Sequence, residues 1–245
     1  YVAVMLLGKV TDTQDTTGTV LEEHPVEVTE EQVKEAVLSF TGEYMQVPPM
    51  YSALKVNGKK LCDLARAGVT VERQARPVQL YSIEIIKMEL PRVCMRVRCS
   101  KGTYIRTLCQ DIGEKLSCGA CMESLLRTKV SEFCVQDALR LSEIEERVQK
   151  AAGQTQSEQW NAEMFDFIYA VDSVFLQYKK AVICKEWNKL LYNGNRMKKD
   201  MFVSYQKDWE QQKVRIYDEE GRFIGIYEYS EIHGDYKPVK LFMEA

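Results

Sequence analysis

The segment CSKGTYIRTL, residues 99–108, places two cations and an aromatic ring around a glycine. Lys101, Tyr104 and Arg106 lie between an alternating, strand-like run and a stretch with apolar residues at helical spacing. Thr103 is therefore the expected N-cap of a helix whose first turn holds the tyrosine and the arginine. A helix N-terminus beside two cations favours an anion such as a phosphate or a carboxylate, and the flat ring offers a surface on which a base stacks.

The same ten residues also permit a purely structural interpretation, with a solvated lysine, a core tyrosine and an internally paired arginine.

Charge is unevenly distributed along the chain. Six basic and two acidic residues lie within 51–77, eight basic and three acidic within 92–129, and three basic and eight acidic within 137–177. A basic half joined to an acidic half is typical of a protein with a polyanion-binding face, and solvated surface charge also gives such a contrast.

The elements that must position these residues begin with YVAVMLLG, residues 1–8, which predict an interior strand. A polar loop follows over 11–18, where the Thr and Asp residues indicate turn and capping hydrogen bonds rather than a divalent-ion loop. Thr29 and Gln32 form a capping-box pattern for a helix that we expect to end at Gly42.

Two adjacent prolines at 48 and 49 exclude a helix at that point, and Asn57-Gly58 is typical of a hairpin tip. A short helix over 61–67 should stop at Gly68. Two further strands, over 80–89 and 93–99, lead into the CSKGTYIRTL segment.

The polar residues 151–162 indicate a loop or linker, and beyond 178 the alternation around Glu220-Gly221 predicts a hairpin in a small β-rich unit. The 245 residues, 45% hydrophobic, suffice for a sizeable core. No stretch approaches the about 18 apolar residues that a membrane span requires, and no signal-peptide pattern opens the chain. We therefore expect a cytoplasmic protein.

Eight cysteines are present, and Cys118 and Cys121 form a C-x-x-C pattern at what we expect to be a helix-to-helix junction. A zinc site requires a second pair or nearby histidines, and His24 and His233 are both distant in sequence. Without a secretory context the thiols are expected to be free. We therefore expect no metal, and a zinc or redox protein is the least favoured interpretation.

Five segments resemble, in the same order, the bacterial tRNA pseudouridine synthases of the TruB family. They are YVAVMLLGKVTDTQDTTG, PPMYSALKVNGKKLCDLARAG, VERQARPV, CSKGTYIRTLCQDIGEKL and LLRTKVSEF. Together they cover Tyr1 to about Val135. The tail, with RFIGIYEY and KPVKLF, resembles more weakly a PUA-type β-barrel, an RNA-binding module.

The resemblance implies an α+β protein. Residues 1–172 would form a pseudouridine synthase domain on a largely antiparallel sheet, and residues 178–245 would form a small PUA-like β-barrel. The implied activity is isomerisation of uridine to pseudouridine at position 55, in the T arm of tRNA, without metal or organic cofactor. The implied partner is tRNA, and we expect a monomer.

The resemblance also implies residue roles. Tyr1 matches an active-site tyrosine that stacks on the target base and relays a proton, and Arg106 matches the arginine that pairs with the catalytic carboxylate. Tyr104 and Leu125 match positions that line the uracil pocket. The expected phosphate contacts are Lys55, Lys59, Lys60 and Lys101.

One family feature is missing from these 245 residues. The nucleophilic aspartate of the family stands in a G-x-L-D-P-x-A-T-G-like motif upstream of the matched region, and no such motif occurs here. We do not expect Asp12, Asp15 or Asp111 to replace it. The chain is therefore expected to be an inactive piece of a synthase, with a first strand that lacks a sheet partner. The alternative is a non-catalytic tRNA-binding protein, or a degenerate synthase that acts as an RNA chaperone.

Overall fold

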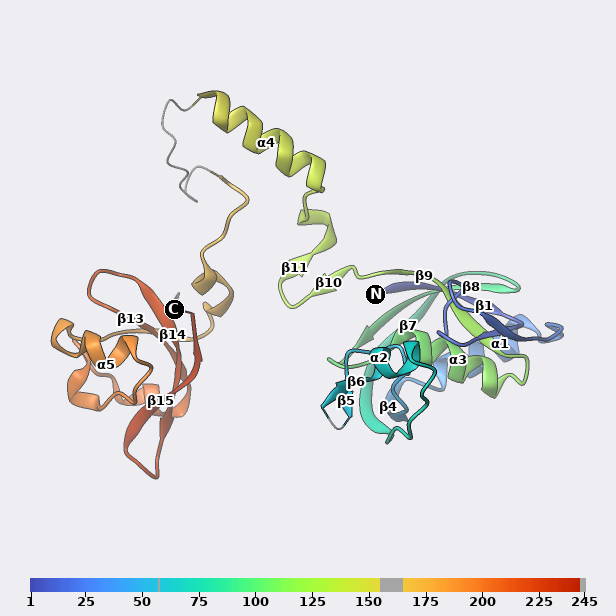
Figure 1. The fold of residues 1–245 in the computed structure, drawn as a ribbon, viewed down its shortest axis with the longest axis horizontal. Helices are drawn as coiled ribbons and strands as arrows, with labels where there is room; N and C mark the ends of the chain where they lie inside the picture. The colour runs from blue at the N-terminus through green and yellow to red at the C-terminus, as the bar shows by residue number, and fades with distance from the viewer. Residues whose placement is uncertain (57, 155–164, 243–245) are drawn as a thin grey trace. The chain divides into compact units, whose positions relative to one another are not determined.

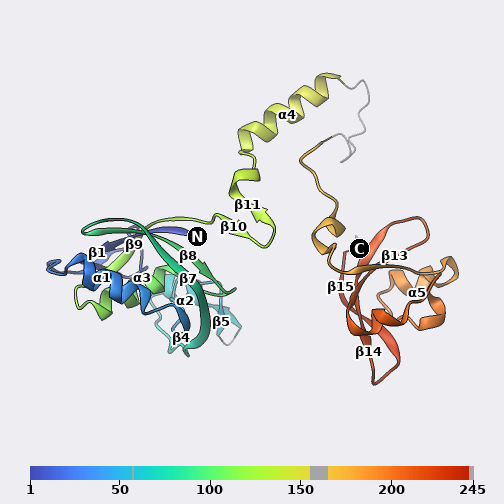
Figure 2. The same ribbon diagram turned by 180° about the vertical axis from the view of Figure 1, so that it is seen from behind.

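The computed structural model describes residues 1–56, 58–154 and 165–242. Two compact units make up the chain, residues Tyr1–Ala138 and Leu139–Ala245 (Figures 1 and 2). The first unit contains the CSKGTYIRTL segment and is the one that positions the candidate site.

A five-stranded sheet forms the centre of the first unit. Its strands run in the order β4 (Gly42–Gln46), β7 (Arg76–Glu89), β8 (Arg92–Cys99), β1 (Val2–Leu7) and β9 (Ala120–Leu126). Every neighbouring pair is antiparallel. The α+β fold with a largely antiparallel sheet is thus confirmed, and so is the interior position of the first strand. The expectation that this strand lacks a partner is wrong, because β8 and β9 flank it on both sides.

Short hairpins and helices complete this unit. The paired strands are β2 (Lys9–Thr11) with β3 (Val20–Glu23), β5 (Lys55–Val56) with β6 (Lys59–Lys60), and β10 (Lys129–Val130) with β11 (Phe133–Cys134). The helices are α1 (Glu30–Leu38), α2 (Leu61–Arg66) and α3 (Ile105–Lys115), with a 3-10 turn at Val135–Asp137.

One hydrophobic core joins the helices to the sheet. Strand β1 alternates between buried and half-buried residues, so that one face of the sheet is closed. Helices α1 and α3 contribute to the same core and lie side by side against that face (Figure 1). The buried apolar residues of these two helices are Val33, Ala36, Val37, Ile105, Leu108, Cys109 and Ile112.

The expected start of α1 is confirmed, and its expected end is wrong. Thr29 and Gln32 form the reciprocal capping box. The helix stops at Leu38, with Ser39 as its C-cap, and Gly42 instead opens β4 with a φ of 113°. Glycine suits this left-handed backbone, which lets the chain leave the helix and enter the edge strand.

The expected N-cap of α3 is also corrected. Tyr104, and not Thr103, is the capping residue, and no side-chain capping bond is formed there. The Thr103 hydroxyl donates backward to the Ser100 carbonyl, 3.0 Å away. The N–H of Tyr104 bonds instead to the side chain of Gln46, at 2.8 Å.

Helix α3 approaches the chain at the start of β9 unusually closely. A Cβ atom on Gly113 would lie 2.2 Å from the backbone nitrogen of Ala120 and 2.4 Å from the carbonyl carbon of Gly119. Only a glycine fits this crossing. Cys118 and Cys121 lie at this point, so the junction leads from helix to strand and not from helix to helix as expected.

The second unit is built on a four-stranded sheet. Its order is β12 (Lys179–Val182), β13 (Lys213–Tyr217), β14 (Phe223–Ser230) and β15 (Asp235–Leu241). The hairpin expected at Glu220-Gly221 is confirmed, with Gly221 at a φ of 83°. Within the described residues the sheet is open, with β12 and β15 as its edges, so the expected closed barrel is not formed.

The remaining elements of this unit are helices and 3-10 turns. They are α4 (Leu141–Gln154), α5 (Asn188–Tyr192) and 3-10 turns at Val171–Phe175, Lys185–Trp187, Lys199–Met201 and Lys207–Gln211. The start of the expected linker at 151–162 is helical through Gln154, and residues 155–162 lie outside the described ranges. In the described parts of the chain, no helix has the length and apolar character of a membrane span.

The 3-10 turn at Val171–Phe175 is bound to the second sheet. The Tyr217 hydroxyl donates to the Asp172 carboxylate at 2.5 Å, and Arg215 Nε donates to the Tyr178 carbonyl at 2.8 Å. The chain near residue 172 therefore packs with the second unit, which begins at Leu139.

We expect Gly113→Ala to lower the free energy of unfolding by about 1 to 3 kcal/mol, because backbone on both sides of the new methyl group would have to move. Urea unfolding followed by circular dichroism measures the change. Glu114→Ala, on the exposed side of the same helix, is the matched control and should change stability by less than about 0.5 kcal/mol. Equal stability of Gly113→Ala and the unsubstituted chain would contradict the close packing.

Candidate active site

Arg106 ties three distant segments together at the start of α3. Its Nη1 donates to the Thr13 carbonyl at 3.0 Å and to Asp15 Oδ2 at 3.2 Å, and its Nη2 donates to the Tyr51 carbonyl at 2.7 Å. The arginine side chain is 22% exposed and that of Asp15 is 17% exposed. The polar loop, the turn after the two prolines and the helix thus meet at one half-buried guanidinium.

Asp15 is held ionised by its surroundings. Oδ1 accepts from the Thr13 hydroxyl at 2.8 Å and from the Thr17 hydroxyl at 2.5 Å and backbone N–H at 3.1 Å. Burial opposes ionisation, but the hydrogen bonds from Thr17 and Thr13 and the charge of Arg106 together lower the pKa of Asp15 below its ordinary value of 3.8. Asp15 is thus the carboxylate that forms an ion pair with Arg106 in this structure.

The polar loop is fixed by bonds of its own. Asp12 Oδ1 accepts from the Thr19 N–H at 2.7 Å, and Thr11 Oγ1 donates to the Asp15 carbonyl at 2.7 Å. The Met122 N–H of β9 donates to the Gln14 carbonyl, and the Thr16 N–H donates to the Met122 carbonyl. The predicted turn and capping role of this loop is confirmed, and the loop adds a carboxylate for Arg106.

Tyr104 lines a cavity of about 190 Å³. The other lining residues are Gln46, Pro48, Leu54, Arg76, Pro77, Val78, Lys101 and Gly102. Lys101 is exposed at the rim. The structure therefore brings the tyrosine and one expected phosphate-binding lysine to the same cavity.

Tyr1 directly precedes β1, and Leu125 lies on the neighbouring strand β9. Ala3 of β1 pairs with Leu125 of β9, whose side chain is 43% exposed. Arg127 Nε donates to the Tyr1 hydroxyl at 3.0 Å, and the Arg127 guanidinium lies 5.3 Å from the centre of the Tyr1 ring. The tyrosine thus has a cationic partner, and its own hydroxyl hydrogen is left free to donate.

Lys55, Lys59 and Lys60 gather on the hairpin of β5 and β6. Lys55 pairs with Lys60 across the hairpin, and all three side chains are exposed. Together with residues of α2 they line an open hollow of about 490 Å³. Among the described residues none of the three lysines has an acidic partner within salt-bridge distance. Their charge is therefore available to an external anion.

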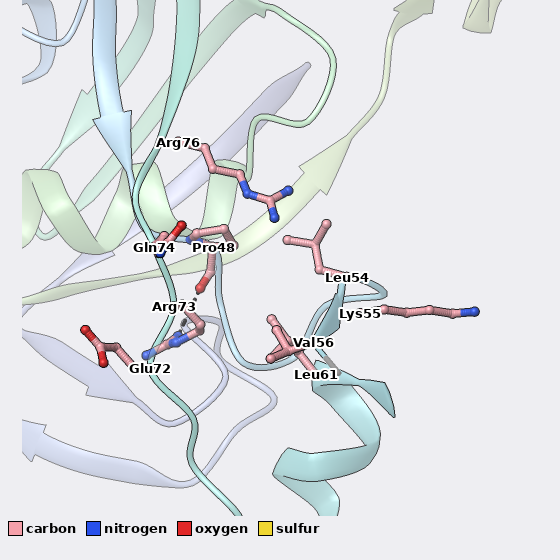
Figure 3. Close-up of a pocket in the computed structure, with 9 residues that line it drawn as sticks. All are labelled: Pro48, Leu54, Lys55, Val56, Leu61, Glu72, Arg73, Gln74 and Arg76. Carbon is pink, nitrogen blue, oxygen red and sulfur yellow. Dashed lines mark hydrogen bonds between the residues drawn. The ribbon is translucent and has the colours of Figure 1, made fainter. Parts of the chain in front are cut away.

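A further cavity, of about 300 Å³, lies between this hairpin and the segment that leads into β7 (Figure 3). Arg73 Nη1 donates to the Pro48 carbonyl at 3.0 Å and fixes one wall. Arg76 and Leu54 line both this cavity and the one beside Tyr104. Figure 3 shows Lys55 extending away from the other lining residues.

Asp111, farther along α3, differs from Asp15 in its surroundings. Burial first, and then the charge of Glu114, raise the pKa of Asp111 to about 6. No hydrogen bond or ion pair of this carboxyl is formed within the described ranges. It does not contact Arg106, as expected from its position on the helix.

The thiols and acids of the described residues provide no metal site. No group of three His, Cys, Asp or Glu side chains gathers there, and Cys118 and Cys121 are both buried. Burial raises the pKa of both thiols.

Three residues at this site were not predicted from the sequence. Asp15 was assigned to turns alone, and neither Gln46 nor Arg127 was singled out. Arg127 lies within LLRTKVSEF, one of the five segments that resemble the family, so the sequence did mark its surroundings as part of a motif. Gln46 carried none, because its partner Tyr104 is 58 residues away.

The fold is shared with proteins in two solved structures. The chain superposes on one protein of the "Crystal Structure of a Cbf5-Nop10-Gar1 Complex" with a TM-score of 0.62 and 21% identity, over 100% of this chain and 64% of that one. A second solved structure, of an "H/ACA RNP bound to a substrate RNA containing 2'-deoxyuridine", gives a TM-score of 0.61, 18% identity and coverage of 99% and 65%. This chain therefore spans less than two thirds of the length of these neighbours.

Sequence relatives define the family. Residues 1–105 match the N-terminal domain of the TruB family pseudouridylate synthases, and residues 106–176 match the tRNA pseudouridylate synthase B C-terminal domain. The chain is 47% identical over 218 residues to tRNA pseudouridine synthase B of Lachnoclostridium phytofermentans, covering 84% of this chain and 67% of the relative. It is 37% identical over 243 residues to tRNA pseudouridine synthase B of Clostridium kluyveri, covering 99% and 78%. The chain belongs to the TruB family of pseudouridylate synthases, and the resemblance drawn from its motifs is confirmed.

Asp15→Asn should destabilise the chain by about 1 kcal/mol at pH 7, because Arg106 then faces a neutral amide. The pKa of Asp15 is lowered in the folded state, so its contribution is present above pH 3.8 and is lost as the pH falls through the folded pKa. Urea unfolding at pH 7 and at successively lower pH measures the difference.

Asp12→Asn is the matched control for this substitution, because Asp12 lies in the same loop and bonds only to a backbone N–H. It should show a smaller effect at pH 7. An Asp15→Asn effect that stays constant down to pH 3 would contradict the assigned ion pair.

Proposed function

We propose that the protein isomerises uridine to pseudouridine in tRNA, at position 55 of the T arm. The observation that carries this proposal is the 47% identity to tRNA pseudouridine synthase B over 84% of the chain. The site supports it, since an aromatic cavity, an arginine and a lysine hairpin provide surfaces for a base, a carboxylate and phosphates.

The reaction breaks the bond between C1′ of the ribose and N1 of the base and joins C1′ to C5 of the same base. The proton on C5 is lost and N1 gains one, so no electron leaves the substrate. Extrusion of the base from the folded T loop costs a few kcal/mol, and stacking against Tyr1, Tyr104 and Leu125 offsets it. The Tyr1 hydroxyl accepts from Arg127, and its own hydrogen serves proton transfer.

The nucleophile in this proposal is an aspartate that the 245 residues do not supply. Asp15 keeps Arg106 in place through one of the guanidinium nitrogens, and the arginine pairs with the nucleophile as well. An opposite charge within about 4 to 6 Å lowers the pKa of a carboxylate, so a nucleophile paired with Arg106 would be ionised at neutral pH.

We also propose the wider assignment of the chain. Residues 1–172 form the catalytic domain, and residues 178–245 form a PUA-like RNA-binding domain. The family match that ends at residue 176 and the strand that starts at Lys179 support a boundary between them. The protein acts as a monomer in the cytoplasm, bound to tRNA through its T arm.

The chain alone should release no tritium from tRNA labelled at C5 of uridine, because it lacks the nucleophile. The same chain, extended at its N-terminus by the residues that precede the matched region in the Lachnoclostridium relative, should release it. Replacement of the motif aspartate in that extension by asparagine is the control and should abolish release.

These outcomes separate the two parts of the proposal. Tritium release by the unextended chain would contradict the missing nucleophile. An extended chain that binds tRNA and releases none would contradict the enzymatic function, and would support a tRNA-binding protein or RNA chaperone instead.

The lysine hairpin should supply the salt-dependent part of RNA affinity. Replacement of Lys55, Lys59 and Lys60 together by alanine should reduce the slope of log K against log salt by about 0.7 to 0.9 for each lysine that contacts a phosphate. Filter binding of a T-arm stem-loop at several salt concentrations measures the slope.

The matched control removes three lysines elsewhere on the same unit, so that the net charge changes equally. They are Lys9, Lys34 and Lys87, of which the first and last pair with Glu23 and Glu89. Equal slopes for the two triple variants would contradict phosphate contact by the hairpin.

A further inference from the structure

Gln46 is a polar residue buried at the end of edge strand β4, with 1% of its surface exposed. Its Nε2 donates to the Tyr104 carbonyl at 3.0 Å, and its Oε1 accepts from the Tyr104 N–H at 2.8 Å. One carboxamide therefore bonds to both backbone polar groups of a single residue, as a neighbouring strand would.

The orientation of this amide is determined by its partners. Tyr104 presents one N–H and one carbonyl, so exchanging Oε1 and Nε2 would place donor against donor and acceptor against acceptor. The second hydrogen of Nε2 points to the Tyr44 hydroxyl, two residues earlier on the same face of β4. The Gln46 amide therefore bonds to Tyr104 through both Oε1 and Nε2, and to Tyr44 through the second hydrogen of Nε2.

The backbone at Tyr104 joins a turn to the start of α3. This residue has the extended backbone of an N-cap, at φ −101° and ψ 109°, and lies just after Gly102, which has a φ of 88°. The Thr103 hydroxyl bonds backward to Ser100. The Tyr104 carbonyl also accepts the first helical bond, from the Leu108 N–H at 3.1 Å. Ser100, at the start of the turn, is bonded to Gln79 of β7, and the side chain of Gln46 joins Tyr104 itself to the edge strand β4.

We infer that Gln46 is a positioning residue for Tyr104, and that it sets where the flipped uridine stacks rather than how tightly the RNA binds. The inference rests on the proposed function, in which Tyr104 contacts the uracil. Backbone phosphates carry most RNA affinity, and three of the four lysines that would bind them, Lys55, Lys59 and Lys60, lie on another element, whereas Lys101 lines the cavity of Tyr104. Base placement and RNA affinity are therefore separable at this site.

The support for Gln46 extends into the unit. Tyr44 packs edge-on against Phe40, with ring centres 5.3 Å apart. Burial, and after it the charge of Asp111, raise the pKa of Tyr44, so its hydroxyl stays neutral and able to accept from Gln46. The amide is thus backed by the end of α1 and by α3, which limits its movement.

The test uses a T-arm stem-loop with thienouridine, a fluorescent uridine analogue, at the target position. Gln46→Met keeps the size of the side chain and removes both bonds to Tyr104. We expect the fluorescence change at saturating RNA to fall by about threefold or more, as the loss of a net hydrogen bond implies. The Kd for the RNA should stay within about twofold.

Gln46→Glu provides a conservative rescue. A neutral carboxyl accepts from the Tyr104 N–H and donates to its carbonyl, whereas a carboxylate cannot donate. Burial raises the pKa of such a carboxyl, so the fluorescence change should approach that of the unsubstituted chain at pH 5.5 and fall as the pH rises to 8. The charged and titratable groups around this amide are Tyr44 on β4, Arg76 on β7, Lys101 before α3, and Asp111, Cys109 and Cys99, which act on Tyr44. The unsubstituted chain measured at the same pH values corrects for them.

Gln110→Glu, on the exposed side of α3, is the matched control and should change neither quantity. Hydrogen exchange of the Tyr104 amide, which requires no RNA, should become about tenfold faster in Gln46→Met. If Gln46→Met does not fold, the pH dependence of Gln46→Glu decides the question.

The results separate this inference from the proposed function. Failure of the unsubstituted chain to bind the stem-loop would contradict the proposed function alone, and the exchange rate would still test the hydrogen bonds. Three results would each overturn the positioning role: normal RNA binding with an unchanged fluorescence amplitude in Gln46→Met, a Kd that rises more than twofold as the amplitude falls, or a pH-independent Gln46→Glu.

Discussion

The guanidinium of Arg106 is the interaction on which the site depends. It takes a carbonyl and a carboxylate from the polar loop, at Thr13 and Asp15, and a carbonyl from the turn at Tyr51. These partners are 93, 91 and 55 residues away from it in sequence. Because the group is half-buried, each bond is shielded from water, and loss of one partner would leave charge or polar atoms poorly compensated.

The rest of the unit keeps that guanidinium where it is. Helix α3 holds Arg106 in its first turn and is pressed against β9 at Gly113, where only a glycine fits. The polar loop is pinned to the same strand through Met122. The backbone of α3 and the backbone of the polar loop are both held against β9, so the position of Arg106 relative to Asp15 is fixed. An ion pair between two flexible surface side chains would not be held in this way.

In the proposed function, different parts of this surface carry RNA affinity and chemistry. The lysine hairpin is exposed and projects from short strands, whereas Tyr104 and Tyr1 are held by the sheet and by buried or cationic partners. Long-range charge attracts a polyanion without fixing it precisely, and a base must be placed within a fraction of an ångström for reaction. The division matches the physical demands of a substrate that is large, anionic and modified at one atom.

The sequence alone determined the elements and the family. Local signals were sufficient for the Thr29 capping box, the hairpin at Gly221 and the alternating strands, because each depends on residues a few positions apart. The motifs were sufficient for the TruB family and for the candidate residues Tyr1, Tyr104 and Arg106.

Only the tertiary structure decided which groups meet. The pairing of Asp15 with Arg106, the hold of Gln46 on Tyr104 and the open second sheet are contacts between distant residues. The N-cap of α3 was misplaced for the same reason, since the Tyr104 N–H found its acceptor 58 residues away rather than on a neighbouring side chain. Spacing along the chain encodes local backbone geometry, whereas such contacts follow from the packing of the whole sheet and its helices.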